Sequence, residues 1–434
     1  MAPWARALPA IFAVLLGGLG AIMGAQPAWA APGSCGAVAA ALDAAAPEGG
    51  ATFVASYGPG PGEAQAPLPL RNTAFAYDNA LAAIALTACG DTARARRIGD
   101  AFLVALASDR SFADGRVRNA YRAGPVTERP VLLPGWWDAG RKQWSEDRYQ
   151  VGTATGNVAW VGLALMTLHD ATGAAPYRAG AVRLLNWITA NAAAHARSTA
   201  GFTGGRDGYD PDQAPLPWTS TEHNLDVVAL GTWLGPDGAE AARTARTFVD
   251  AAFDPSSGCF RMGTSPEGRM RDTAKLALDT QLWPQLAVAE PPAAWQRALA
   301  CAEARLGVLG GFDFNDDRDG LWVEGTAQAA LAYRTVGERE RGRALLATSM
   351  QERAPSGLLY ATREAQITTG LTIGPTSSHG DFLYYRRPHL GATAWAVLAE
   401  AGWNPFDGKI IPDSDGKISP ARFRQQGPAS QPLR

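Results

Sequence analysis

The sequence predicts an all-α protein: an (α/α)6 toroid of inner and outer helices, with long loops that deepen a cleft on one side. Two observations predict this fold. A polar group opens an apolar segment rich in small residues six times along the chain, which indicates internal repeats. Most of these segments precede an amphipathic segment rich in Arg and Glu, as expected of a helix with one buried stripe and one charged face. A buried helix followed by an external one, repeated in this way, describes a ring of helical hairpins.

Six polar residues open the apolar segments. The segments read YDNALAAIALTA, GNVAWVGLALMTL, EHNLDVVALGTW, LDTQLWPQLAV, VEGTAQAALAY and PHLGATAWAVLA, and their polar residues are Asp78, Asn157, Glu222, Asp279, Glu324 and His389. If the inner helices run parallel around the ring, all their N-termini lie on one face. We therefore expect these six side chains to converge on one end of the toroid.

The amphipathic segments are expected to form the outer layer. They include TARARRIGDAFLVAL, APYRAGAVRLLNWI, GAEAARTARTFVDAAF and ERERGRALLATSM. The sixth inner helix has no outer partner after it, and the segment 34–46 has no inner partner before it. Pairing these two would close the ring.

The N-terminal segment, residues 1–30, is typical of a signal peptide. Arg6 precedes the apolar run IFAVLLGGLGAIMG, and Ala28 and Ala30 form a small-x-small pattern. The run is shorter than the roughly 20 residues that a membrane span needs. We expect cleavage after residue 30, export to the periplasm or the medium, and no span in the mature chain.

The rest of the chain is expected to form one catalytic domain and a tail. Residues 31–405 carry all six repeats, and residues 406–434 are polar and rich in Pro, so we expect this tail to be poorly ordered. The formal net charge of -2 gives no electrostatic basis for binding nucleic acid. The sequence also lacks a nucleotide-binding loop, a GxSxG elbow and an HExxH motif. We expect a monomer.

Four cysteines in an exported protein favour two disulfides. Three pairings are possible. We favour Cys35–Cys89 and Cys259–Cys301, because each closes a local loop and the first would attach the N-terminal helix to the first hairpin. No CxxC spacing occurs, so we expect neither a metal nor a cofactor.

Glu222 is the main candidate for a catalytic acid. The stretch TSTE matches a capping box, with Thr219 as the cap and Glu222 at the third helical position. Capping leaves the neighbouring Trp218 and His223 unexplained. A carboxyl group beside an apolar ring can have a raised pKa and serve as a general acid.

Three further carboxylates are candidates for the base. Asp279 and Asp78 either cap their helices or face the cleft, and Glu324 is the next candidate. Glu324 also ends DFNDDRDGLWVE, which has the ligand spacing of an EF-hand calcium loop. Arg318 stands where that loop needs Gly, so we favour a polar substrate loop.

Further residues are candidates for substrate binding because they lie at helix openings or in the loops beside them. Fourteen Trp in the chain suit the apolar faces of pyranose rings, although Trp160 and Trp283 are expected to pack between helices. The binding candidates are Tyr77, Asn157, Arg206, Trp218, His223, Asn224, Trp322, His379, Asp381, Tyr385 and His389.

With these features, residues 34–405 resemble the bacterial (α/α)6-barrel glycoside hydrolases. The resemblance implies that two carboxylates cleave the glycosidic bond of a polysaccharide or oligosaccharide, with Glu222 as acid, Asp279 or Asp78 as base, and inversion at the anomeric carbon. Similar toroids also include polysaccharide lyases and sugar epimerases. A lyase would use Tyr and His of SSHGDFLYYRRPH, with Arg206 or Arg386 neutralising a uronate. A glycan-binding protein without catalysis would keep only the aromatic residues.

Overall fold

The computed structural model describes residues 33–59, 65–194, 200–372, 380 and 382–412, and these residues belong to one compact unit. The predicted signal peptide lies outside the described residues, as do His379, Asp381 and residues 413–434. No described helix is long and apolar enough to cross a membrane.

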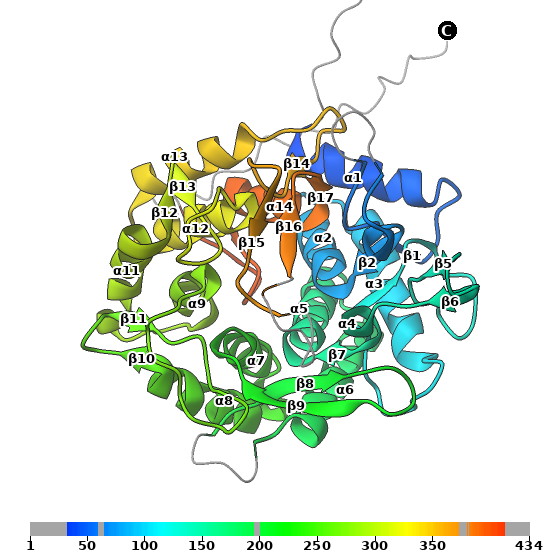
Figure 1. Ribbon diagram of the computed structural model, residues 1–434, viewed down its shortest axis with the longest axis horizontal. Helices are drawn as coiled ribbons and strands as arrows, with labels where there is room; N and C mark the ends of the chain where they lie inside the picture. The colour runs from blue at the N-terminus through cyan, green and yellow to red at the C-terminus, as the bar shows by residue number, and fades with distance from the viewer. Residues whose placement is uncertain (1–32, 60–64, 195–199, 373–379, 381, 413–434) are drawn as a thin grey trace, which may run out of the picture. The chain divides into compact units, whose positions relative to one another are not determined.

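An inner ring of helices confirms the predicted architecture (Figure 1). Each inner helix packs on the next around the ring, and the sixth packs on the first. In ring order, the inner helices are α2 (Ala76–Ala88), α5 (Thr155–Thr172), α7 (Thr221–Trp233), α9 (Leu278–Leu282) with α10 (Pro284–Ala287), α12 (Val323–Thr335) and α14 (Leu390–Ala401).

An outer helix packs against each inner one. The outer helices are α3 (Thr92–Ala107), α6 (Ala175–Asn191), α8 (Ala239–Ala252), α11 (Arg297–Leu306), α13 (Arg339–Met350) and α1 (Ser34–Ala45). As predicted, α1 packs on α14 and so completes the sixth hairpin. The disulfides Cys35–Cys89 and Cys259–Cys301 are both formed, which confirms the predicted pairing.

Small residues let the inner helices approach closely. A Cβ on Gly162 of α5 would lie 2.5 Å from Cδ2 of Leu230 on α7, so nothing larger than Gly fits there without a shift of the leucine. Bulky side chains fill the centre of the ring instead. Trp160, Trp283 and Trp395 contact one another there, and each also contacts the ring of Phe406.

That contact corrects the predicted start of the tail. Phe406 is buried, and strand β18 (Trp403–Asn404) pairs with β19 (Lys409–Ile410). The folded unit therefore extends past residue 405. The prediction followed the polar composition of residues 406–434 and overlooked Phe406, which packs into the core.

Two inner helices differ in detail from the prediction. The fourth inner helix breaks at Trp283 and continues as α10, because Pro284 has no N–H to donate to the preceding turn. The cap of α7 is Ser220, whose hydroxyl accepts a hydrogen bond from the backbone N–H of His223. Thr219 is not the cap, Glu222 is at the second helical position, and the predicted capping box is wrong.

Short antiparallel strands connect the helices. Eight pairs are two-stranded: β1 (Thr52–Phe53) with β4 (Gly124–Pro125), β2 (Thr73–Phe75) with β3 (Ala120–Arg122), β5 (Trp136–Asp138) with β6 (Gln143–Ser145), β10 (Phe253–Asp254) with β11 (Cys259–Phe260), β12 (Gly307–Val308) with β13 (Gly311–Phe312), β14 (Leu359–Tyr360) with β17 (Pro388–His389), β15 (Gln366–Thr368) with β16 (Leu383–Tyr385), and β18 with β19. One sheet has three strands, β7 (Thr153–Ala154), β8 (Thr203–Asp207) and β9 (Ala214–Thr219). Short helical segments complete the connections: α4 (Arg148–Val151), η2 (Leu68–Leu70), η3 (Gly235–Asp237) and η4 (Ala293–Gln296).

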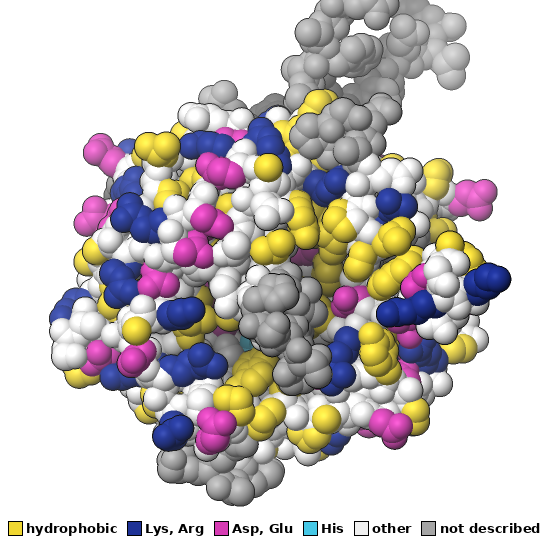
Figure 2. Space-filling model, in the orientation of Figure 1, with side chains coloured by type: hydrophobic (Ala, Val, Ile, Leu, Met, Phe, Trp, Pro, Cys, Tyr) yellow, Lys and Arg dark blue, Asp and Glu magenta, His cyan; other side chains and the backbone are white. Residues whose placement is uncertain are grey.

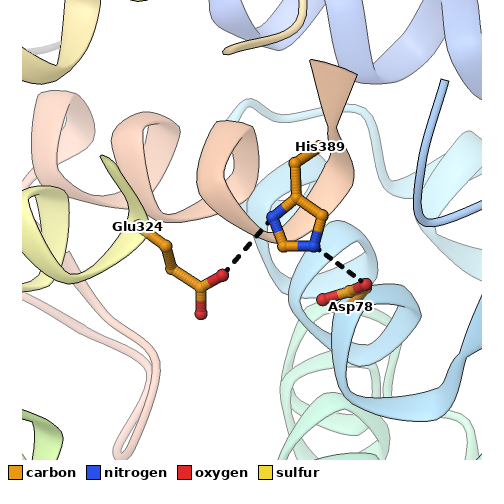
Figure 3. Close-up of side chains that lie close together, drawn as sticks. All are labelled: Asp78, Glu324 and His389. Carbon is orange, nitrogen blue, oxygen red and sulfur yellow. Dashed lines mark ion pairs between the residues drawn. The ribbon is translucent and has the colours of Figure 1, made fainter. Parts of the chain in front are cut away.

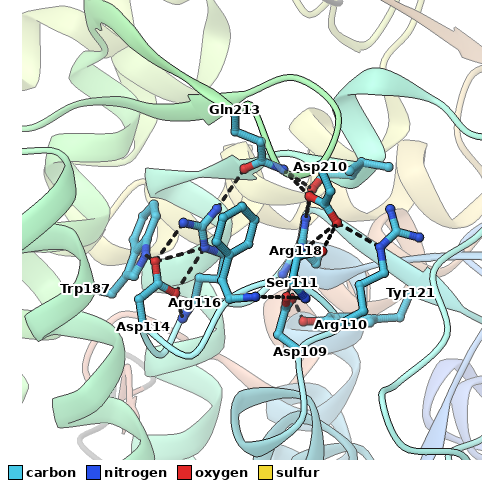
Figure 4. Close-up of polar contacts among 12 residues, drawn as sticks. Asp109, Arg110, Ser111, Asp114, Arg116, Arg118, Tyr121, Trp187, Asp210 and Gln213 are labelled. Atoms are coloured by element: carbon cyan, nitrogen blue, oxygen red, sulfur yellow. Dashed lines mark hydrogen bonds and ion pairs between the residues drawn. The ribbon is translucent and has the colours of Figure 1, made fainter.

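A buried ionic network holds the β8–β9 hairpin in place (Figure 4). The guanidinium of Arg118 is fully buried and donates to Asp109 Oδ2 at 2.6 Å and to Asp210 Oδ1 at 2.7 Å. Asp210 lies in the turn between the two strands. Gln213, in the same turn, donates to the carbonyl of Val151 at 3.0 Å and accepts from Arg116 at 2.7 Å. These contacts fix the position of a hairpin that reaches the functional site.

Candidate active site

A cavity of about 610 Å³ lies at the N-terminal ends of the inner helices. The six polar residues predicted to converge all line it: Asp78, Asn157, Glu222, Asp279, Glu324 and His389. The repeat alone therefore located the site. In Figure 2, hydrophobic side chains gather near the centre of this face, with Asp, Glu, Arg and Lys side chains among them.

His389 lies between two carboxylates in the wall of this cavity (Figure 3). Its Nε2 is 3.4 Å from Asp78 Oδ2, and its Nδ1 is 3.6 Å from Glu324 Oε2. Nδ1 also accepts the backbone N–H of Ala392 at 3.2 Å, which caps α14 and leaves the proton of the neutral ring on Nε2, facing Asp78. Burial lowers the pKa of His389, but the charges of Asp78 and Glu324 outweigh burial and raise the pKa above its usual value.

The same three residues could be read as metal ligands, since their donor atoms lie within 4.8 Å of one another. The capping bond from Ala392 argues against that use, because a metal on either ring nitrogen would disturb the bond at Nδ1 or the pairing at Nε2. Gly391 keeps the cluster compact. A Cβ there would lie 2.6 Å from Asp78 Oδ1 and 2.9 Å from Glu324 Oε2.

Glu324 is held by neutral donors on its other side. Tyr77 donates its hydroxyl to Oε1 at 2.7 Å, and Gln328 donates to the same oxygen at 3.4 Å. Trp395 donates in turn to the Tyr77 hydroxyl at 2.8 Å. Burial raises the pKa of Glu324 to about 7, with further contributions from Asp78 and Asp279. This carboxyl group therefore titrates near neutral pH.

Glu222, the predicted acid, also has a raised pKa. Burial raises its pKa well above the usual value, and the charges of Asp279 and Glu324 raise it further. Its side chain still keeps partial contact with the cavity. Burial also raises the pKa of Asp279 to about 7, although the backbone N–H of Thr280 donates to its Oδ1 at 2.7 Å. The raised pKa of Glu222 favours its protonated form, which is the form that can donate a proton.

Two further groups on α7 have pKa values shifted in the direction that favours the uncharged form. Burial lowers the pKa of His223 to about 4, so its ring is uncharged at neutral pH. Burial, together with Glu222 and Asp279, raises the pKa of Asp226 well above its usual value. Asp226 is completely buried, and a hydrogen bond from Trp160 partly offsets the rise in its pKa.

Aromatic rings form much of the cavity wall. The ring of Trp218 lies over β8, where a Cβ on Gly204 would come within 2.6 Å of it. Trp322 packs edge to face with Phe314, and both line the cavity. Trp160 and Trp283 are buried between helices as predicted, and they also contribute to the cavity lining.

Several polar atoms in this wall have no hydrogen-bond partner among the described residues. They are Arg206 Nε, Thr219 Oγ1, His223 Nδ1, Trp322 Nε1 and Glu324 Oε2. Buried polar groups are ordinarily paired with protein, water or ligand, so exceptions that gather around one cavity are informative. Both donors and acceptors are present, which suits a ligand bearing many hydroxyl groups.

Two binding predictions are wrong. Asn224 is fully buried and bonds to the backbone of Phe202 and Ser220, so its role is structural. Tyr385 does not line the cavity, whereas its neighbour Tyr384 does. Side chains alternate along a strand, and the sequence did not reveal which tyrosine faces inward.

The EF-hand-like spacing does not gather its five ligands. Asp313, Asp317 and Asp319 have carboxylate oxygens close together, but Glu324 points into the cavity and belongs to the His389 cluster. Asp317 and Asp319 accept hydrogen bonds from Thr368.

Other predicted binding residues do line the cavity: Tyr77, Asn157, Arg206, Trp218, His223, Trp322 and His389. Tyr384, one of the tyrosines named for the lyase alternative, also lines it. The sequence analysis missed further lining residues: Tyr57, Asn119, Tyr149, Arg271, Phe314, Gln328 and Phe382. Most of these lie in connections between helices, where no periodic pattern points a side chain inward. Gln328 alone had a usable signal, because it follows Glu324 by one helical turn.

No protein-family model and no curated protein matches the chain. Solved structures share its fold: a glycosidase (15% identity, TM-score 0.55, covering 84% of this chain and 94% of that one), a sugar epimerase from a ruminal bacterium (12%, 0.56, 84% and 96%) and an alpha-mannanase from Bacteroides thetaiotaomicron (12%, 0.52, 84% and 94%). A variant of that glycosidase has been solved in complex with glucose. The chain thus has the (α/α)6 toroid fold that these glycoside hydrolases share with a sugar epimerase.

Proposed function

We propose that the protein is an exported glycoside hydrolase that cleaves a polysaccharide or oligosaccharide with inversion at the anomeric carbon. One observation carries the proposal. Glu222, a carboxyl group with a pKa raised well above its usual value, lies in an aromatic-lined cavity with further carboxylates from other inner helices. Paired carboxyl groups, one protonated and one charged, are what glycoside hydrolysis requires.

Glu222 serves as the general acid. Its protonated form donates to the glycosidic oxygen as the bond to the anomeric carbon breaks, so the leaving sugar departs as a neutral alcohol. Asp279, on the neighbouring inner helix, contributes to the raised pKa of Glu222. In this account Asp279 keeps the acid protonated.

Asp78 serves as the general base. The order of the ring supports this choice, because α14 with its neighbours α2 and α12 lies opposite α7. The cluster of Asp78, His389 and Glu324 therefore faces Glu222 across the cavity. A water beside Asp78 attacks the anomeric carbon and passes its proton to Asp78, while Glu222 protonates the leaving oxygen. A base on the far wall leaves room for that water, which favours inversion.

The walls supply the binding energy for a sugar. Trp218 and Trp322 offer apolar faces to pyranose rings, and the unpartnered donors and acceptors around them match hydroxyl groups. Of the two arginines named for the lyase alternative, only Arg206 lines the cavity. Arg386 is paired with Glu352 at 2.9 Å and stacks on Tyr360, so it is engaged away from the cavity.

The test is glycan cleavage in water enriched in heavy oxygen. The mature protein and its Glu222→Gln variant are incubated with a broad glycan panel, and the products are weighed by mass spectrometry. The proposal expects heavy oxygen at a new reducing end, lost in the variant. NMR of the first-formed anomer reports inversion. Products lighter by one water would instead identify a lyase, an isomer of unchanged mass an epimerase, and binding without any product a glycan-binding protein.

Export is tested separately. The two disulfides support an oxidising location for the folded protein. Cell fractionation and N-terminal sequencing of the mature chain should find it outside the cytoplasm and starting near Ala31. A full-length cytoplasmic protein would contradict this part of the proposal.

A further inference from the structure

Two arginines in the cavity wall lack the carboxylate partners that other arginines nearby have. Arg206 and Arg271 both line the cavity, and neither forms an ion pair with a carboxylate among the described residues. In contrast, Arg116, Arg118 and Arg148, which also surround the β8–β9 hairpin, each pair with an aspartate. The paired arginines stabilise the fold, whereas Arg206 and Arg271 have guanidinium groups that a ligand can use.

Arg206 is the better defined of the two. It lies in β8, and its Nε is buried without a hydrogen-bond partner, while its Nη1 makes a single long contact of 3.4 Å with the carbonyl of Gln213. The adjacent carboxylate, Asp207, is already paired with Arg148. A guanidinium keeps its charge at any physiological pH, so a buried and unpaired N–H of this group favours an anion in the cavity.

Arg271 approaches the same wall from the loop after β11. Its backbone N–H donates to Gly263 at 2.9 Å, and its Nε donates to the carbonyl of Thr264 at 3.2 Å. Thr264 is bonded in turn to Thr219, the last residue of β9. Because β9 pairs with β8, both arginines border the part of the cavity that holds Trp218, next to the start of α7.

We propose that the substrate carries an anionic substituent, a carboxylate or a sulfate ester, which Arg206 binds with help from Arg271. A planar guanidinium matches either group with two parallel hydrogen bonds. Burial raises the pKa of Glu222 well above its usual value, which favours the uncharged form beside an anion. Four other carboxyl groups line the cavity. Asp207 is paired with Arg148, burial raises the pKa of Asp279 to about 7, and Asp78 and Glu324 lie beside His389. The inference deepens the proposed function: it assigns an acidic glycan to the same site.

The experiment measures binding rather than cleavage, so that it can fail independently of the proposed function. The Glu222→Gln protein is applied to an array of matched glycan pairs: uronate-containing oligosaccharides beside their carboxyl-reduced forms, and sulfated ones beside their desulfated forms. We expect at least tenfold tighter binding to the acidic member of one kind of pair. Preference only within the uronate pairs identifies a carboxylate, and preference only within the sulfated pairs identifies a sulfate ester.

Variants then assign the preference to Arg206. Arg206→Gln should abolish it and Arg206→Lys should restore part of it. Arg178→Gln is the matched control, because Arg178 pairs with Asp237 on the outer layer and should leave the preference unchanged. Equal binding within every pair, no binding to any acidic glycan, or an Arg206→Gln protein that keeps the preference while remaining folded would overturn the inference. A preference without any cleavage by the wild-type protein would overturn the proposed hydrolysis and leave the inference standing.

Discussion

Two buried clusters of carboxylates in this molecule have opposite electrostatics. Around Arg118, burial alone would raise the pKa of Asp210, but hydrogen bonds from Arg118 and Arg110 outweigh it and hold the pKa at about 2. Around His389, no arginine approaches among the described contacts, and burial raises the pKa of Glu324 to about 7. In the first cluster, arginines stabilise the charged form of the carboxylates. The second cluster lacks such a permanent positive charge among the described contacts.

This difference separates a structural role from a chemical one. The Arg118 cluster holds a hairpin by remaining charged, so its proton content does not change near neutral pH. The cavity carboxyls share one imidazole and neutral donors, so they can gain and lose protons in the range where an enzyme works. Perturbed carboxyls gathered in a cavity are therefore a better guide to function than ion pairs as such.

The largest expected effect concerns activity. Glu222→Gln should lower kcat/KM about 10²–10⁴-fold, because the amide cannot donate the proton that the leaving oxygen needs. Its thermal unfolding temperature should not fall, since the change removes a carboxyl crowded by Asp279 and Glu324. Initial rates and thermal unfolding test this together. Full activity in a folded variant would exclude Glu222 as the acid.

The structural cluster should respond in the opposite way. Arg118→Met should destabilise the protein by about 3–5 kcal/mol, because Asp109 and Asp210 lose the buried charge that pairs with them. Denaturant unfolding measures the loss. The exposed pair of Arg178 with Asp237 provides the control, and Arg178→Met should cost at most about 1 kcal/mol. Equal losses of unfolding free energy in the two variants would show that the buried network stabilises the fold no more than an exposed ion pair does.

The two clusters should also give stability opposite dependences on pH. The pKa of Glu324 is about 7 in the folded state, above its ordinary value of 4.5, so stability falls as pH rises from about 4.5 to 7. The pKa of Asp210 is about 2, below 3.8, so its contribution is present above pH 3.8 and is lost as pH falls through 2. Unfolding temperatures measured across pH should show that Glu324→Gln flattens only the upper slope and Asp210→Asn only the lower one. If both variants changed the same part of the curve of unfolding temperature against pH, the two clusters would not differ in their electrostatics.

The smallest effect is expected at Gly391. Its Ala variant places a methyl group 2.6 Å from Asp78 Oδ1 and 2.9 Å from Glu324 Oε2, so the carboxylates must shift. We expect a loss of about 1–3 kcal/mol in stability, typical of overpacking, together with reduced activity. Gly162→Ala offers a comparison away from the cavity, because it crowds only Leu230. If Gly391→Ala and Gly162→Ala reduced activity equally, the cause would be the disturbed packing of the helices and not the position of the cavity carboxylates.

The repeat in the sequence was sufficient to predict the ring, its closure by the N-terminal helix and the convergence of six polar residues. Those predictions rest on periodic patterns, which specify where helices begin and which face is buried. The partners of each carboxylate could not be predicted, because Asp78, Glu324 and His389 come from helices far apart in the chain. Arg118 carries no local signal for the same reason.

Two local errors have local causes. Trp283 precedes a proline, and this break in a buried helix was overlooked even though Pro has a known effect on helices. Phe406 sits in a polar segment, where composition outweighed one aromatic residue.

The most direct test of the account is an NMR titration of the protein with carbon-13 labels in its Asp and Glu carboxyl groups. The account predicts carboxyl signals that titrate near pH 7, of which one disappears in Glu324→Gln and another in Asp279→Asn, while Asp210 titrates near pH 2. If every carboxyl group in the folded protein titrates below pH 5, the cavity has no proton donor at neutral pH, and the proposed acid catalysis is contradicted.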